Sequence, residues 1–134
     1  MTIALDKEES EKYFYNSLCN GLYYFSGYGI RLSVSEEDYT EAKKVLALAA
    51  ISNNSPCYED VLMQVLRNGG KLSIVDEEGG EDSEQNVSIT LADVHERVSL
   101  TPIEHLAAMV NENDDATTAD VILQTVFFKE TIYA

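Results

Sequence analysis

Carboxylates are the side chains of this chain with the greatest capacity for chemistry. Twenty-four Asp and Glu stand against nine Lys and Arg and two His, which gives a formal charge of −15 at pH 7. Carboxylates can ligate hard cations, transfer protons in pairs, or attract basic proteins. The charge is uneven, because residues 69–134 carry fourteen acids and only three bases. Such a surface repels nucleic acid and anionic membranes.

The spacing of the Asp and Glu residues can first be compared with that of known cation-binding motifs. The run Asp76–Glu84 places Asp76 and Glu78 at alternating positions, but Gly80 stands where an EF-hand loop has a third oxygen ligand. The run Asn111–Asp115 lies between two predicted helices and is typical of an ordinary interhelix loop. Paired carboxylates are so frequent that no pair identifies a general acid and its base. We therefore predict no metal site, no cofactor and no catalytic residue.

Histidine and cysteine do not supply a stronger motif. His95 and His105 form no HExxH pattern, and a predicted helix break separates them. Cys19 and Cys57 form no CxxC pattern, and no local signature pairs either of them with a histidine as a nucleophile. We expect two small buried thiols in a reducing, cytoplasmic environment.

Tyrosine is concentrated near the start of the chain. Five tyrosines lie there, at Tyr13, Tyr15, Tyr23, Tyr24 and Tyr28. Tyrosine is enriched at protein interfaces, because it covers apolar area at low entropy cost and keeps a polar tip. The sequence leaves open whether these rings form an interface or lie against the core with their hydroxyls outside. Base stacking on them is disfavoured by the negative charge.

Helical periodicity predicts most of the elements that position these side chains. Residues 10–25 form a helix that ends at Ser26–Gly29. A second helix starts at Ser55–Pro56 and stops at Gly69-Gly70. Ser/Thr-x-x-Glu/Asp patterns predict further helix starts at Ser35, Thr90, Thr101 and Thr117.

The predicted β structure is a hairpin over residues 71–91. Lys71–Val75 and Val87–Leu91 have strand composition, and the polar segment 76–86 between them is expected to be a mobile acidic loop. Ile30–Val34 predicts a short strand or an extended lead-in. Glu130–Ala134 is expected to return as an edge strand beside the hairpin, since two strands alone are marginally stable.

Composition and organisation together predict one domain. The 134 residues are 45% hydrophobic, include only two Pro, and contain no repeat or linker. We predict a single helix-dominated α+β domain over residues 1–134, with residues 1–9 frayed. No apolar stretch reaches the roughly 18 residues of a membrane span, and the first residues do not resemble a signal peptide. A soluble, cytoplasmic protein is expected.

The charge distribution favours a non-enzymatic interaction module. We expect a basic protein as its partner, and no direct contact with nucleic acid or membrane. In the most specific form of this hypothesis the chain mimics nucleic acid and inhibits a nucleic-acid-binding protein, as small acidic inhibitors from phages and mobile elements do. The predicted partner-binding residues are Asp76, Glu77, Glu78, Glu81, Asp82, Glu84, Glu112, Asp114, Asp115, Asp120, Tyr23, Tyr24 and Tyr28.

Two other classes of function stay open. The Tyr-rich first helix could form a homo-oligomer interface, which predicts self-association that depends on concentration. Alternatively, a pocket between the helices and the hairpin could bind a small ligand or carry an enzymatic reaction. That pocket would be a concave cluster with a histidine or with carboxylates of shifted pKa.

Overall fold

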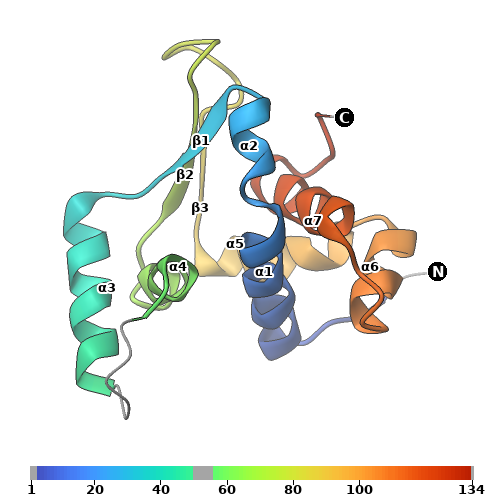
Figure 1. The fold of residues 1–134 in the computed structure, drawn as a ribbon, viewed down its shortest axis with the longest axis horizontal. Coiled ribbons are helices and arrows are strands. Elements are labelled where there is room, and N and C mark those ends of the chain that lie inside the picture. The colour runs from blue at the N-terminus through green and yellow to red at the C-terminus, as the bar shows by residue number, and fades with distance from the viewer. Residues whose placement is uncertain (1–2, 50–55, 134) are drawn as a thin grey trace.

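Helices predominate in residues 3–49 and 56–133, which the computed structural model describes, and three strands form one antiparallel sheet (Figure 1). This arrangement confirms the predicted helix-dominated α+β class. The helices are α1 (Lys7–Gly21), α2 (Tyr24–Gly27), α3 (Glu36–Ala49), α4 (Tyr58–Arg67), α5 (Leu91–Arg97), α6 (Ile103–Val110) and α7 (Ala116–Phe128), with a 3-10 turn at Val98–Leu100. The strands are β1 (Ile30–Ser33), β2 (Leu72–Asp76) and β3 (Val87–Ile89).

The sheet has the order β1-β2-β3, and both neighbouring pairs are antiparallel. β2 and β3 are the predicted hairpin. Its buried side chains alternate along the strands, so that Leu72 and Ile74 face the core together with Ile89. On the opposite face the hydroxyls of Ser73 and Ser88 lie 2.7 Å apart. One face of the sheet is therefore part of the core and the other is polar.

The third strand is β1 and not the C-terminal segment, so the prediction of a C-terminal edge strand is wrong. β1 pairs with β2 along its whole length, from Ile30–Asp76 to Ser33–Ser73. Residues 131–133 form no strand. A side chain, and not a neighbouring strand, binds their backbone N–H groups. Oε1 of Gln124 accepts hydrogen bonds from the N–H groups of Ile132 (2.9 Å) and Tyr133 (2.8 Å). Ala134 lies outside the described residues.

Helix α7 is the centre of the core. Every residue from Thr118 to Phe127 is buried. Figure 1 shows α7 beside the junction of α1 and α2, and α7 packs against α1, α5, α6 and β3. Phe127 lies between two other buried rings, with centroid distances of 6.2 Å to Phe14 and 6.1 Å to Phe25. A helix enclosed on all sides needs apolar residues on every face, and the buried polar side chains of this one, Thr118, Asp120, Gln124 and Thr125, all form hydrogen bonds.

The first predicted helix is two helices with a kink. α1 begins at Lys7, three residues earlier than expected, because Asp6 and Glu9 form a capping box that satisfies free N–H groups. It ends at Gly21, and α2 continues after a turn. Ile3, in the segment predicted to fray, packs against the core.

The predicted helix starts are correct at two of the four patterns. Ser35 accepts a hydrogen bond from the N–H of Asp38, and the N–H of Thr90 donates to Asp93. Thr101 forms no cap, because α6 starts only at Ile103; the Oγ1 atom of Thr101 is buried without a partner. Thr117 lies inside α7, because Asp115 caps that helix two residues earlier. The predicted start at Ser55 lies outside the described residues.

Helix α3 lies at the edge of the molecule, at the left of Figure 1, and packs mainly against α4. It buries only Ala42 completely, and Leu48 on its outer side is 90% exposed. Among the described residues, no helix combines the length and the apolar character that crossing a bilayer requires.

Candidate functional site

The acidic loop between β2 and β3 is organised by the carboxylate of Asp76. Its Oδ1 accepts hydrogen bonds from the N–H groups of Glu78 (3.1 Å) and Gly79 (2.9 Å), and its Oδ2 accepts one from Oγ of Ser83 (2.5 Å). These bonds, led by the one from Ser83, lower the pKa of Asp76. Asp76 is thus a structural residue of the loop, because hydrogen bonds within the chain already engage its carboxylate.

Asn86 closes the other side of the loop. Its Oδ1 accepts from the N–H of Asp76 (2.7 Å), and its Nδ2 donates to the carbonyls of Gly80 (2.8 Å) and Glu81 (3.1 Å). The carbonyl of Gly29 accepts from the N–H of Glu77, which ties the loop to the start of β1. The loop that composition suggested to be mobile therefore has a specific hydrogen-bonded conformation.

Five carboxylates project from this ordered loop. Glu77, Glu78, Glu81, Asp82 and Glu84 are all exposed. Among the described residues, one ion pair reaches them, between Glu77 and Arg31 at 4.0 Å, and both of its side chains are more than half exposed. We call these five residues the loop carboxylates. They form a local excess of negative charge that the fold does not neutralise.

A pair of half-buried tyrosines lies beside the loop. The ring of Tyr133 stacks on that of Tyr28, with centroids 4.7 Å apart and an 8° angle between the planes. Burial raises the pKa of Tyr133, and the nearby charges of Asp76 and Glu78 raise it further. Tyr28 also donates a hydrogen bond to Oδ2 of Asp120 (2.5 Å). The C-terminal segment, α7 and the acidic loop thus meet around Tyr28.

Asp120 does not belong to an exposed acidic surface, contrary to the prediction. It is 7% exposed, and its Oδ2 also accepts a hydrogen bond from Gln124 (3.1 Å). The reason is the position of α7 in the core, which encloses a residue that the sequence places on an outer first turn. Tyr28 is likewise occupied by internal contacts. Tyr23 is 64% exposed and stacks on the half-buried Tyr24 at 4.5 Å, so this pair remains accessible.

The second predicted acidic group lies elsewhere. Asp115 is the N-cap of α7 and accepts from the N–H of Thr118, which lowers its pKa. Glu112 has a left-handed backbone conformation, with φ of 59°, in the turn after α6, and Asp114 follows it. Figure 1 shows the hairpin loop at the top and α6 at the right, with α2 and α7 between them. The acidic half of the sequence is therefore divided into two separate groups in space.

The two histidines have separate structural partners. Nε2 of His95 lies 2.9 Å from Oε2 of Glu11, whose Oε1 pairs with Arg67 at 3.1 Å. His105 contacts the hydroxyl of Thr118, with 3.3 Å between Nδ1 and Oγ1. Within the described ranges, no cluster of three or more His, Cys, Asp and Glu side chains has the arrangement of a metal site.

The stability contributed by Glu11 is expected to depend on pH. Burial raises the pKa of Glu11, but the hydrogen bonds from His95 and Arg67 outweigh this and lower it below the usual 4.5. A carboxylate whose pKa is lower in the folded than in the unfolded protein stabilises the fold when the pH lies above its pKa in the unfolded state. This contribution is lost as the pH falls through the pKa of the folded state. Glu11→Gln should therefore lower the free energy of unfolding by about 1 kcal/mol at pH 7.

Urea denaturation at pH 7 and at about pH 3.5 measures this difference, which should shrink at the lower pH. The matched control is Glu8→Gln, an exposed carboxylate on the same helix. It should change the free energy of unfolding by less than about 0.5 kcal/mol at both pH values. An equal loss at both pH values for Glu11→Gln would contradict the role of its charge.

Both cysteines are free and exposed, so the expectation of two buried thiols is wrong. Cys19 lies on the outer side of α1, and Cys57 directly precedes α4. The Sγ atom of Cys57 lies 3.6 Å from the hydroxyl of Tyr15, which donates to Asp60. The physical reason is that a small apolar side chain is tolerated at a helix end or on an outer face as well as in a core.

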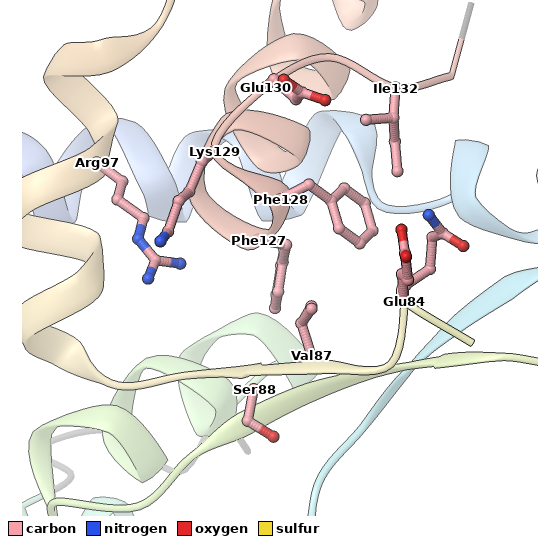
Figure 2. Close-up of a pocket in the computed structure, with 10 residues that line it drawn as sticks. Glu84, Val87, Ser88, Arg97, Phe127, Phe128, Lys129, Glu130 and Ile132 are labelled. Atoms are coloured by element: carbon pink, nitrogen blue, oxygen red, sulfur yellow. The ribbon is translucent and has the colours of Figure 1, made fainter. Parts of the chain in front are cut away.

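A pocket of about 480 Å³ lies between the hairpin and the end of α7 (Figure 2). Figure 2 shows the nitrogen ends of Arg97 and Lys129 next to each other, with Phe127 and Phe128 beside them. Arg97 is already engaged, because it donates to the carbonyl of Val126 (2.9 Å) at the end of α7 and pairs with Asp93 (3.1 Å). The carboxylates of Glu84 and Glu130 also line the pocket.

This pocket lies where the small-ligand alternative placed one, between helices and hairpin. Among the residues that the structure describes, its lining contains two acids, two bases and no histidine. Its charges therefore balance, and it selects no class of ligand by charge. The loop carboxylates are the stronger candidate for a functional site, because their charge is unbalanced.

No protein family, no curated protein and no solved structure matches this chain, so no relative indicates which candidate site is functional.

Proposed function

We propose that this protein is an acidic interaction module that binds a basic protein through the loop carboxylates and masks a surface with which that partner binds nucleic acid. The observation that carries the proposal is the ordered loop itself. Asp76 and Asn86 hold its backbone by hydrogen bonds, while five other carboxylates point to solvent with one weak ion pair among the described residues. A basic partner is the chemistry that complements them.

An ordered loop binds more strongly than a disordered acidic tail of the same charge. A tail must lose conformational entropy when it binds, whereas this loop has its conformation before the partner arrives. Each exposed ion pair contributes only about 0.2–1 kcal/mol, so several carboxylates have to act together. The charge also accelerates encounter with a basic surface, and salt weakens the interaction. Nucleic-acid-binding proteins carry the basic surfaces that match this requirement.

Neutralising the loop should weaken binding to a basic partner. The variant Glu77→Gln, Glu81→Gln, Asp82→Asn keeps the shape of these side chains and leaves Asp76 and Asn86 intact. At about 0.5 kcal/mol for each charge, affinity should fall by about tenfold. Isothermal titration against a panel of small DNA-binding domains with pI above about 9 measures this change. The wild-type chain should bind at low salt, weaken as salt rises to about 200 mM, and be displaced by duplex DNA.

The matched control removes the same charge from other elements. Glu8, Glu96 and Glu104 are exposed on α1, α5 and α6, and their triple change to Gln should leave the affinity within about twofold. Equal weakening by both triple variants would show that only net charge matters and would contradict a specific role for the loop. Absence of binding to every basic domain at low salt would refute the proposed function.

A further inference from the structure

The two cysteines of the chain meet at the hydroxyl of one tyrosine. Sγ of Cys57 lies 3.6 Å from the hydroxyl oxygen of Tyr15, and the thiol of Cys19 forms a hydrogen bond with the same hydroxyl. Tyr15 and Cys19 are one helical turn apart on α1, so their side chains lie on one face of that helix. Cys57 directly precedes α4, which packs beside α1 and lies away from the hairpin loop (Figure 1). Two thiols that are far apart in the sequence are therefore neighbours in the fold.

The carboxylate of Asp60 holds Tyr15 and Cys57 together. Its Oδ1 accepts a hydrogen bond from the hydroxyl of Tyr15 (2.7 Å), and its Oδ2 accepts one from the backbone N–H of Cys57 (3.2 Å). The bond from Tyr15 lowers the pKa of Asp60, and the same bond raises the pKa of Tyr15. At neutral pH the carboxylate is therefore charged and the hydroxyl is protonated, which keeps the ring of Tyr15 beside Cys57.

Both thiols are exposed, so a reagent in solution can reach them. Because each thiol contacts the same oxygen atom, the distance between the two sulfur atoms is at most the sum of two such contacts. Rotation of the exposed side chains about their Cα–Cβ bonds can shorten this distance. Partial burial raises the pKa of the Cys19 thiol, the charges of Glu59 and Asp60 raise it further, and the bond from Tyr15 opposes them in part. Any special reactivity of this pair therefore comes from the nearness of a second thiol and not from an unusually acidic one.

We propose that Cys19 and Cys57 are a reversible oxidation site, which closes to an internal disulfide on reaction with a low-molecular-weight disulfide such as oxidised glutathione. One protein thiolate attacks a sulfur atom of the oxidant, forms a mixed disulfide and releases one glutathione. The second protein thiolate attacks the protein sulfur of that mixed disulfide, closes the Cys19–Cys57 bond and releases the second glutathione. Two electrons pass from the protein to the oxidant, and the two thiol protons end on the two glutathione molecules. The new bond joins α1 to the start of α4.

The test equilibrates the full chain with mixtures of reduced and oxidised glutathione and identifies the products by mass spectrometry. The folded chain should lose the mass of two hydrogen atoms and carry no glutathione. Trypsin places the two cysteines in separate peptides, 13–31 and 45–67, which should be recovered as one linked species. Cys19→Ser and Cys57→Ser are the matched controls, because each variant keeps one thiol. Each should instead gain the mass of one glutathione.

The same equilibrium in urea shows what the fold contributes. The effective concentration of one thiol at the other should be at least tenfold higher in the folded chain, because only a flexible loop brings the two together in the unfolded chain. An equal or lower value in the folded chain would show that the fold holds the thiols apart and would overturn the inference. Addition of two glutathione molecules to the folded chain, or disulfide-linked dimers, would also overturn it. This inference goes beyond the proposed function and does not rest on it, since none of these outcomes measures binding of a basic partner.

Discussion

Replacing Gly21 with alanine is expected to lower the free energy of unfolding by about 2 kcal/mol. A Cβ atom at this position would lie 2.8 Å from the backbone carbon of Ala119 and 2.8 Å from the backbone nitrogen of Asp120. Backbone atoms cannot rotate away, so α1 and α7 would have to move apart. Gly21 does not have a positive φ, and alanine would therefore fit its backbone conformation. The expected loss comes from the close approach of the two helices.

Gly27 is the matched control for this change. It also ends a helix, and an added Cβ there would meet no atom within 4 Å. Gly27→Ala should change the free energy of unfolding by less than about 0.5 kcal/mol or increase it slightly, because alanine favours the helix. Urea denaturation of both variants gives the comparison. Equal free energies of unfolding for the two variants would contradict the proposed contact between α1 and α7.

Replacing Gln124 with leucine is expected to release the C-terminal segment and to lower the free energy of unfolding by about 2–3 kcal/mol. The side chain is fully buried, and leucine has a similar volume. Its amide makes four hydrogen bonds, to the N–H of Ile132, the N–H and C=O of Tyr133, and the carboxylate of Asp120. The buried carboxylate would lose one of its two donors, and Tyr133 would lose the bonds that hold it on Tyr28.

Hydrogen exchange measures this release directly. The amides of Ile132 and Tyr133 should exchange at least tenfold faster in Gln124→Leu than in the unmodified chain. Gln64→Leu is the control, because Gln64 lies on α4 and, among the described residues, its side chain bonds only to the side chain of Asn68. It should change the free energy of unfolding by less than about 0.5 kcal/mol. Unchanged exchange at Ile132 and Tyr133 would show that Gln124 does not hold the C-terminal segment.

Local patterns predicted the elements of the fold well. The hairpin, the end of α4 at Gly69-Gly70 and the caps at Ser35 and Thr90 follow from short-range hydrogen bonding and backbone preference, so a sequence window contains their causes. The predicted cap at Thr101 is wrong because α6 starts only at Ile103, and the predicted cap at Thr117 is wrong because a neighbouring residue caps α7 instead. Asp115 is an equally good N-cap two residues before Thr117, and the pattern alone does not decide between them.

The candidate site was predictable in part. Glu77, Glu78, Glu81, Asp82 and Glu84 are exposed, as their polar, glycine-rich context indicates. The order in their loop was missed, although Asp76 followed by a glycine three residues later is a known turn pattern and was the available signal. The hollow that Tyr23 and Tyr58 line beside β1 had no such signal, because it depends on which side of β2 that strand occupies.

By itself the sequence determined the class of the fold, the position of the hairpin and the excess of negative charge, because composition and short-range preference are properties of neighbouring residues. Only the tertiary structure decided that α7 lies at the centre, that Asp120 is buried on Tyr28, and that β1 and not the C-terminal segment completes the sheet. Burial and strand pairing are contacts between residues far apart in the chain, and many alternative pairings satisfy the same local pattern. The packing of the whole core selects one of them.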